Sequence, residues 1–232
     1  MDLNSNFWAG VSGAIVGAVV GGIISYLLQR QSLSEARRQR KAESVQDEER
    51  RKADDTRVQR ALGTSLLFKV ISIEANLDAL YRYFGESYEN ARNNQLEGNP
   101  WTYFQPLANH PEPIYFSPNE MGMLLGLRDD ALFNEMLILD RDHNHLVAQS
   151  VLLSTILRTI ASQARVERVD GEVLVSRYPL EAVPRQVEAD SLVRQMHSDL
   201  KLRAPASRNT LSRLHQLLRT RVGIEFQLRF KN

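Results

Sequence analysis

The chain has 232 residues and a mass of 26.4 kDa, and its fractions of hydrophobic residues (43%) and charged residues (25%) are those of an ordinary globular protein. Its 29 Lys and Arg nearly balance its 28 Asp and Glu, so the net charge of +1 identifies no class of partner. The absence of cysteine excludes disulfides, a thiolate nucleophile, an iron–sulfur cluster and a cysteine-ligated zinc.

Residues 7–28 form an uncharged, mostly apolar segment. As a helix its 22 residues would span about 33 Å, enough to cross the hydrocarbon core of a bilayer. A cleaved signal peptide would need Lys or Arg before this segment, and residues 1–6 contain neither. A buried core helix is the other alternative, and the highly charged segment that follows argues against it. We therefore expect a single transmembrane helix.

The residues on either side of this segment predict its orientation. Residues 1–6 have no basic side chain, whereas five follow the segment within about 15 residues, so we expect the N-terminus outside and the C-terminal part in the cytoplasm. The expected location is the cell (inner) membrane. The same cations are expected to contact anionic lipid headgroups. They are Arg30, Arg37, Arg38, Arg40 and Lys41.

Small residues are ordered along the predicted membrane helix. One row has a spacing of four residues, and Gly10 begins a neighbouring row of Gly and Ala. Such a face allows two helix backbones to approach closely in lipid, so we predict self-association as a homo-oligomer, with packing against another membrane protein as the main alternative. The predicted face consists of Gly10, Gly13, Gly17, Gly21 and Ser25.

Residues 29–60 contain ten Lys or Arg and seven Asp or Glu, with very few large apolar side chains. No heptad seam can be written through them, so they do not predict a coiled coil. Pairs four residues apart, such as Asp47 with Arg51 and Glu48 with Lys52, favour a solvated helical stalk.

Residues 61–232 are expected to form a mainly α-helical cytoplasmic domain. Apolar residues spaced by three and four predict helices over residues 66–84 and 132–160. Ser117, followed by Pro118 and by Glu120, predicts the start of a short helix between them. Two further helices are expected over residues 186–202 and 208–221, the second ending at Gly223.

Signals for β-structure are few. Valines flank Asp170 and Gly171, a dipeptide typical of hairpin turns, and apolar residues alternate over 224–230. A small β-hairpin or sheet near the C-terminus is therefore expected within the mainly helical domain.

Residues 85–117 contain four prolines, and the part from residue 100 to residue 117 contains five of the 17 aromatic residues of the chain. Such a long connection is typically functional or disordered, and its aromatic content argues against disorder. We expect it to wrap the helical body and cover its core, with a partner-binding surface as the alternative. The aromatic residues are Trp101, Tyr103, Phe104, Tyr115 and Phe116.

Charge is distributed unevenly in this domain. Residues 85–142 carry ten acidic and three basic side chains, and residues 201–232 carry eight basic and one acidic. We expect these blocks to meet within one fold or across a homo-oligomer. Lipid and nucleic acid are the alternatives for the basic segment, but no nucleic-acid-binding motif accompanies it.

The chain contains none of the phosphate-binding, dinucleotide-binding, zinc-protease or nucleophile-elbow motifs that identify common enzymes. One cluster, Asp140, Asp142, His143 and His145, has side chains that bind metals. On a helix, however, His143 and His145 point in different directions, and a catalytic site needs at least three ligands. The favoured interpretation is a polar layer, with His143 hydrogen-bonded in the core.

These observations predict a non-enzymatic, membrane-anchored adaptor or sensor without a cofactor, whose partners are the lipid bilayer, further copies of the chain and another protein. Two alternatives stay open. One is a pore-forming effector in which the glycine-rich helices assemble after the cytoplasmic domain responds to a trigger. The other is a metal-dependent enzyme that uses the Asp140–His145 cluster.

Overall fold

The computed structural model describes the backbone of residues 3–169 and 173–225, and the side chains of residues 38–41, 43–164 and 178–225. The described chain is mainly helical, as expected. Its long helices are α1 (Leu3–Asn93), α3 (Asp130–Gln163) and α4 (Val183–Arg221). The shorter elements are η1 (Pro100–Tyr103), α2 (Pro118–Gly126), β1 (Arg165–Val169), β2 (Val173–Arg177) and η2 (Leu180–Ala182). The chain divides into two units, residues 1–57 and residues 58–232.

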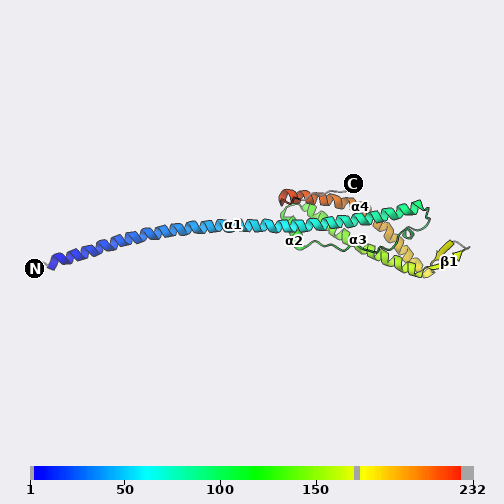
Figure 1. The fold of residues 1–232 in the computed structure, drawn as a ribbon, viewed down its shortest axis with the longest axis horizontal. Coiled ribbons are helices and arrows are strands. Elements are labelled where there is room, and N and C mark those ends of the chain that lie inside the picture. The colour runs from blue at the N-terminus through cyan, green and yellow to red at the C-terminus, as the bar shows by residue number, and fades with distance from the viewer. Residues whose placement is uncertain (1–2, 170–172, 226–232) are drawn as a thin grey trace. The chain divides into compact units, whose positions relative to one another are not determined.

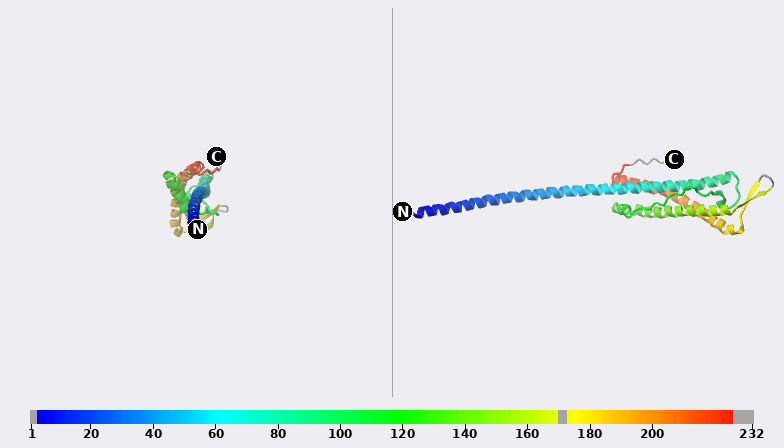
Figure 2. Two further views of the ribbon diagram at one scale, coloured as in Figure 1. Left: turned by 90° about the vertical axis from the view of Figure 1, so that its left-hand side faces the viewer. Right: turned by 60° about the horizontal axis from the view of Figure 1, so that its bottom comes forward.

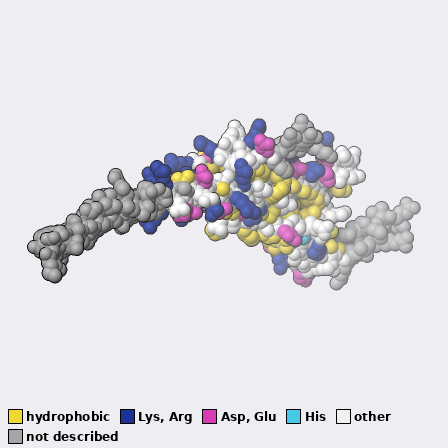
Figure 3. Space-filling model, turned by 60° about the vertical axis from the view of Figure 1, so that its left-hand side comes forward, with side chains coloured by type: hydrophobic (Ala, Val, Ile, Leu, Met, Phe, Trp, Pro, Cys, Tyr) yellow, Lys and Arg dark blue, Asp and Glu magenta, His cyan; other side chains and the backbone are white. Residues whose placement is uncertain are grey.

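In the first unit the backbone is helical from Leu3 onward. Every described side chain between residues 38 and 57 is exposed, and Lys52 pairs with Glu48 at 2.7 Å, which confirms that predicted contact. Figure 3 shows the Lys and Arg side chains that gather where the described part of this helix begins. Local interactions such as the Glu48–Lys52 pair therefore support the helix in this segment.

The predicted membrane segment, residues 7–28, has a helical backbone, but its side chains lie outside the described ones. Within the described part of the chain, no helix has both the length and the apolar character needed to cross a bilayer.

The second unit is a bundle of three long helices. The apolar stripes predicted for α1 and α3 are buried along their whole length, from Leu66 to Phe84 and from Leu132 to Ile160. Figures 1 and 2 show that α1 and α3 run in the same direction and that α4 returns beside them. The core lies between these three helices and is completed by residues of α2 and of the connection after α1.

This arrangement explains the long connection after α1. Because α1 and α3 are parallel, the chain must return along the bundle before α3 can begin, and residues 94–117, here called the crossover loop, make that return. Its backbone contacts α3 in descending order, with Leu107 opposite Ser154, Ile114 opposite Asn144 and Phe116 opposite Asp140. The loop is therefore extended and antiparallel to α3.

Helix α2 begins as its sequence predicts. The Ser117 hydroxyl accepts a hydrogen bond from the Glu120 backbone, and the Glu120 carboxylate accepts one from the Ser117 backbone, with Pro118 in the first turn. These two bonds satisfy donors that the start of a helix leaves without partners.

The prediction of two helices over residues 186–202 and 208–221 was wrong, because α4 is continuous from Val183 to Arg221 with Pro205 inside it. Proline removes one backbone hydrogen bond and bends a helix, but it does not have to end one. Figure 1 shows α4 changing direction along its length. Buried residues on both sides of the proline, Leu200 and Leu211, hold both halves on the same core. The predicted end at Gly223 is confirmed, with a positive φ of 70°.

The predicted hairpin is present as a two-stranded antiparallel sheet in which Arg165 pairs with Arg177 and Val169 with Val173. Its turn residues, 170–172, lie outside the described part of the chain, and so do residues 226–232, on which the predicted additional strand depends.

Candidate functional site

A groove of about 310 Å³ runs between α3 and α4 on the surface of the second unit. Its floor is apolar and includes the buried Leu77 of α1 and Leu139 of α3, and the exposed Ile138 of α3 and Ala206 of α4 also line it. Charged side chains lie at its rim. We call this feature the α3–α4 groove. Its other lining residues are Glu135, Asp142, Arg203, Ser207, Asn209, Thr210 and Arg213.

The sequence of α4 explains why a hollow forms at this point. Pro205 lies next to Ala204, Ala206 and Ser207, and the small side chains of Ala206 and Ser207 line the groove. Bending at the proline alters the course of the helix, and the small side chains leave the space beside α3 unfilled. The groove is thus a direct consequence of the segment from Ala204 to Ser207.

Two ion pairs span the groove, one near each end. The Arg203 guanidinium lies 2.9 Å from the Asp142 carboxylate, and Arg213 pairs with Glu135 and, at 3.5 Å, with Asp129. In both pairs the acid is on α3 and the arginine on α4. All these side chains are partly exposed, so each pair contributes little to stability but gives the groove an acidic and a basic side.

These pairs also confirm that the acidic and basic blocks of the sequence meet within one fold. Arg203 and Arg213 belong to the basic block, and their partners belong to the acidic one. A third arginine of the basic block, Arg208, pairs instead with Glu74 and Asp78 of α1. The side-chain hydrogen bond to Glu74 is the main reason that the pKa of Arg208 is raised.

The four residues of the candidate metal cluster do not converge on a common point. His143 is fully buried, with its Nε2 atom 3.1 Å from the Asn76 amide, and burial lowers the pKa of its imidazole. Asp140 accepts a hydrogen bond from the Phe116 backbone, Asp142 pairs with Arg203, and His145 is exposed. Among the described residues no three His, Asp or Glu side chains are placed to hold one metal ion. The polar-layer interpretation of His143 is confirmed.

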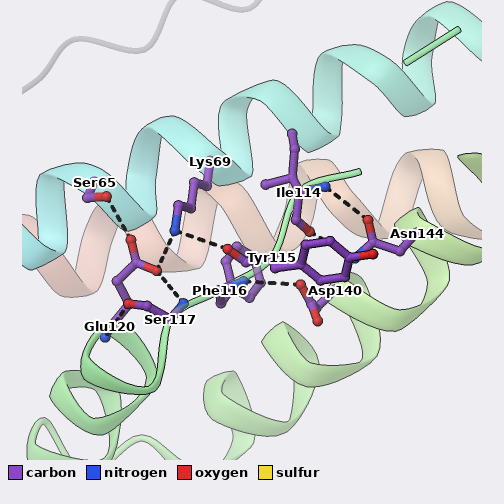
Figure 4. A network of polar contacts seen from close by, with 9 residues as sticks. All are labelled: Ser65, Lys69, Ile114, Tyr115, Phe116, Ser117, Glu120, Asp140 and Asn144. Atoms are coloured by element: carbon purple, nitrogen blue, oxygen red, sulfur yellow. Dashed lines mark hydrogen bonds and ion pairs between the residues drawn. The ribbon is translucent and has the colours of Figure 1, made fainter. Parts of the chain in front are cut away.

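A polar network centred on the buried Glu120 carboxylate joins α1 to the start of α2 (Figure 4). The Glu120 side chain accepts hydrogen bonds from Ser65 and from Lys69, both at 2.7 Å, and Lys69 also donates to the Tyr115 carbonyl at 3.0 Å. Burial would raise the pKa of Glu120, but the hydrogen bonds from Lys69, Ser117 and Ser65 outweigh it and lower the pKa. The network fixes the end of the crossover loop to α1.

A second clamp fixes the same part of the loop to α3. The Asn144 side chain donates to the Ile114 carbonyl and accepts from the Ile114 amide, each at 2.9 Å, as a neighbouring strand would (Figure 4). Further along, Arg158 donates to the Leu107 carbonyl. Backbone groups that a helix or sheet would satisfy are therefore satisfied by side chains of α3.

The aromatic residues of the crossover loop mostly cover the core. Trp101 and Phe104 are buried, Tyr103 and Phe116 are partly buried against the same cluster, and only Tyr115 of the five is exposed. Phe104 packs against Phe84 with their ring centroids 4.6 Å apart. This confirms the prediction of a segment that wraps the body. The alternative of a partner-binding surface stays a prediction, and Tyr115 is the most exposed of the five residues named for it.

The predicted membrane-side residues are described only in part. Arg38, Arg40 and Lys41 are exposed. The side chains of Arg30 and Arg37, and of the glycine-rich face from Gly10 to Ser25, lie outside the described ones.

The α3–α4 groove was missed by the sequence interpretation. The signal that could have revealed it is a proline surrounded by small residues inside an otherwise regular amphipathic pattern. Lys69 and Asn144 were also missed, because nothing in their local sequence indicates which distant backbone group they bind.

No protein-family model, curated protein or solved structure matches this chain. The function must therefore be inferred from the residues themselves.

Proposed function

We propose that this chain is a single-pass membrane-anchored adaptor or sensor, with its helical body in the cytoplasm, that self-associates through the glycine-rich face of its membrane helix. The observation that carries the proposal is the uncharged 22-residue segment 7–28, whose glycines recur every four residues. The helical backbone from Leu3 onward is consistent with it.

The cytoplasmic side is supported by the basic residues that follow the segment, of which Arg38, Arg40 and Lys41 are exposed and free to meet headgroups. The adaptor role is supported by the body itself. It is a packed helical bundle whose surface offers the α3–α4 groove, with an apolar floor and charged rim suited to a protein contact.

The anchor is tested by carbonate extraction of membranes from cells that express the chain with a C-terminal reporter. Val16→Arg places a charge in the middle of the segment and should release the chain into the extract, because a charge at the bilayer centre opposes insertion. Val45→Arg, in the exposed helix, is the matched control and should stay in the membrane. Extraction of the unmodified chain, or protease access to the reporter from outside intact cells, would contradict the proposal.

Self-association is tested by replacing Gly13, Gly17 and Gly21 with Leu, which prevents close approach of two helices. We expect loss of the oligomer in mild detergent. Replacing Val16 and Val19 with Leu changes side chains outside the glycine row and should leave the oligomer intact. Equal oligomer size in both variants would exclude the glycine face as the contact.

A further inference from the structure

We propose that the α3–α4 groove is the contact surface for a second copy of this chain, arranged about a twofold axis parallel to α3 and α4. This contact is separate from the glycine-rich face and lies on residues 135–142 of α3 and 203–213 of α4. Three features of the groove carry the inference: the direction of its ion pairs, its exposed apolar side chains and the helices that bound it.

The first feature is charge complementarity. Both ion pairs across the groove point the same way, with Glu135 and Asp142 on α3 and Arg213 and Arg203 on α4. Rotation by 180° about an axis parallel to the helices places α3 of one copy over α4 of the other and keeps residues at the same level along the bundle. Each acid then faces an arginine of the second copy, so that charges alternate in sign around a four-membered ring. An axis perpendicular to the helices would instead place acid over acid.

The second feature is the fit of apolar groups. Ile138 remains 43% exposed at the groove, on the α3 side. The ion pairs put Ile138, between Glu135 and Asp142, at the level of the α4 segment between Arg203 and Arg213. The same rotation therefore brings Ile138 of each copy over Ala206 and Asn209 of the other, where the small residues after Pro205 leave the hollow. The exposed Leu202 lies four residues before Ala206, on the same side of α4, and extends the apolar contact.

The third feature is the direction of α1 in the two copies. Because the axis is parallel to α3 and α4, and α1 runs alongside them in the body, residues 58–93 of α1 point the same way in both copies. Two chains anchored in one membrane have their bodies on the same side of it, and this relation allows both chains to enter the dimer from the same end. This step alone rests on the proposed function, whereas the charge and apolar arguments hold without it.

The absence of cysteine allows a sharp test, because any introduced thiol is the only one in its chain. Two differently tagged full-length chains, Ile138→Cys and Ala206→Cys, are co-expressed and oxidised in native membranes. We expect a disulfide-linked heterodimer. The matched control replaces Ile138→Cys by Leu137→Cys, since Leu137 is 48% exposed and next to Ile138 but on another side of α3. Linkage at the level of this control would overturn the proposal, and linkage of either cysteine chain to another protein would assign the groove to that partner instead.

A charge exchange separates the contact between copies from the fold of each copy. Glu135→Arg combined with Arg213→Glu keeps opposite charges at residues 135 and 213 within each chain, although the contact of residue 213 with Asp129 is lost. Two exchanged chains still face each other with opposite charges. An exchanged chain facing an unmodified one brings arginine over arginine and glutamate over glutamate. We expect cross-linking to be several-fold weaker for the mixed pair than for either matched pair. Equal cross-linking of all three pairs would contradict the proposed axis.

The two self-association surfaces are distinguished by repeating the cross-linking with Leu at positions 13, 17 and 21. Persistence of the Ile138→Cys to Ala206→Cys link would show that the groove contact is independent of the glycine face. If the chain is extracted by carbonate but the link still forms, the proposed anchor fails and the groove contact stands.

Discussion

Two Glu–Lys pairs in this chain have the same 2.7 Å separation but very different surroundings. The pair between Glu48 and Lys52 belongs to the charged helix of residues 38–57, and its side chains are 66% and 73% exposed. The pair between Glu120 and Lys69 belongs to the body, and its side chains are 3% and 32% exposed. The same contact supports one turn of helix in the first case and joins two distant segments in the second. Solvent exposure and sequence separation, more than the N–O distance, determine what such a pair contributes to stability.

The largest contrast between the two regions is expected for apolar truncation. Ile73→Ala removes a fully buried side chain from the centre of the bundle and should lower the free energy of unfolding by about 2–5 kcal/mol, because a cavity remains. Val45→Ala, at an exposed position, should change it by less than about 0.5 kcal/mol. Urea unfolding, followed by Trp101 fluorescence in a Trp8→Phe background, measures both. A similar loss of unfolding free energy in both variants would mean that the side chain of Val45 is buried by a tertiary contact.

The two ion pairs themselves give the second contrast. Glu120→Gln leaves the Lys69 ammonium without its charged partner, and we expect a loss of about 2–3 kcal/mol, reduced from the value for a fully buried pair because Lys69 is partly exposed. Glu48→Gln should cost no more than about 0.5 kcal/mol. Urea unfolding followed by Trp101 fluorescence measures both losses. Equal losses in Glu120→Gln and Glu48→Gln would indicate that burial does not determine how much each pair stabilises the fold.

The Glu120 network also predicts an acid-dependent stability. Since the folded-state pKa of Glu120 is lowered below its ordinary value of 4.5, its stabilising contribution is present above that value and is lost as the pH falls through the folded-state pKa. The acid-induced decline below pH 4.5 should therefore be shallower in Glu120→Gln. Glu48→Gln is the control and should retain the slope of the unmodified chain.

These contrasts also show which parts of the fold can be predicted from sequence. The stripes from Leu66 to Phe84 and from Leu132 to Ile160, and the cap at Ser117, were predicted correctly because a regular period or a local hydrogen bond determines them. The continuity of α4 through Pro205 was not, because packing on both sides of the proline outweighs its local effect. The α3–α4 groove and the partners of Lys69 depend on residues distant in sequence, which a single sequence does not reveal.

A smaller loss of stability is expected at Ile114, where the Asn144 side chain holds the crossover loop by neutral hydrogen bonds. Asn144→Ala removes both partners of the Ile114 backbone and should destabilise the body by about 1–2 kcal/mol. Asn134→Ala, at an exposed position of the same helix, is the matched control for helix propensity. Faster amide exchange at Ile114 in the first variant alone would locate the effect in the loop. No change there would show that the other contacts of this segment, with Lys69 and Asp140, are sufficient to hold it.

The smallest expected effect tests the buried His143 in the range of physiological pH. Burial lowers the pKa of its imidazole below the ordinary value of 6.5, so the folded chain favours the neutral form. Its contribution is complete above pH 6.5 and declines as the pH falls below that value towards the folded-state pKa, by at most about 0.8 kcal/mol between pH 7.5 and 6. Unfolding free energies at these two pH values should therefore differ less in His143→Gln than in the unmodified chain. The exposed His145, two residues further along α3, provides the control through His145→Gln, because its side chain reaches water in both the folded and the unfolded chain. If both glutamine variants changed the pH dependence equally, burial of His143 would not be its source.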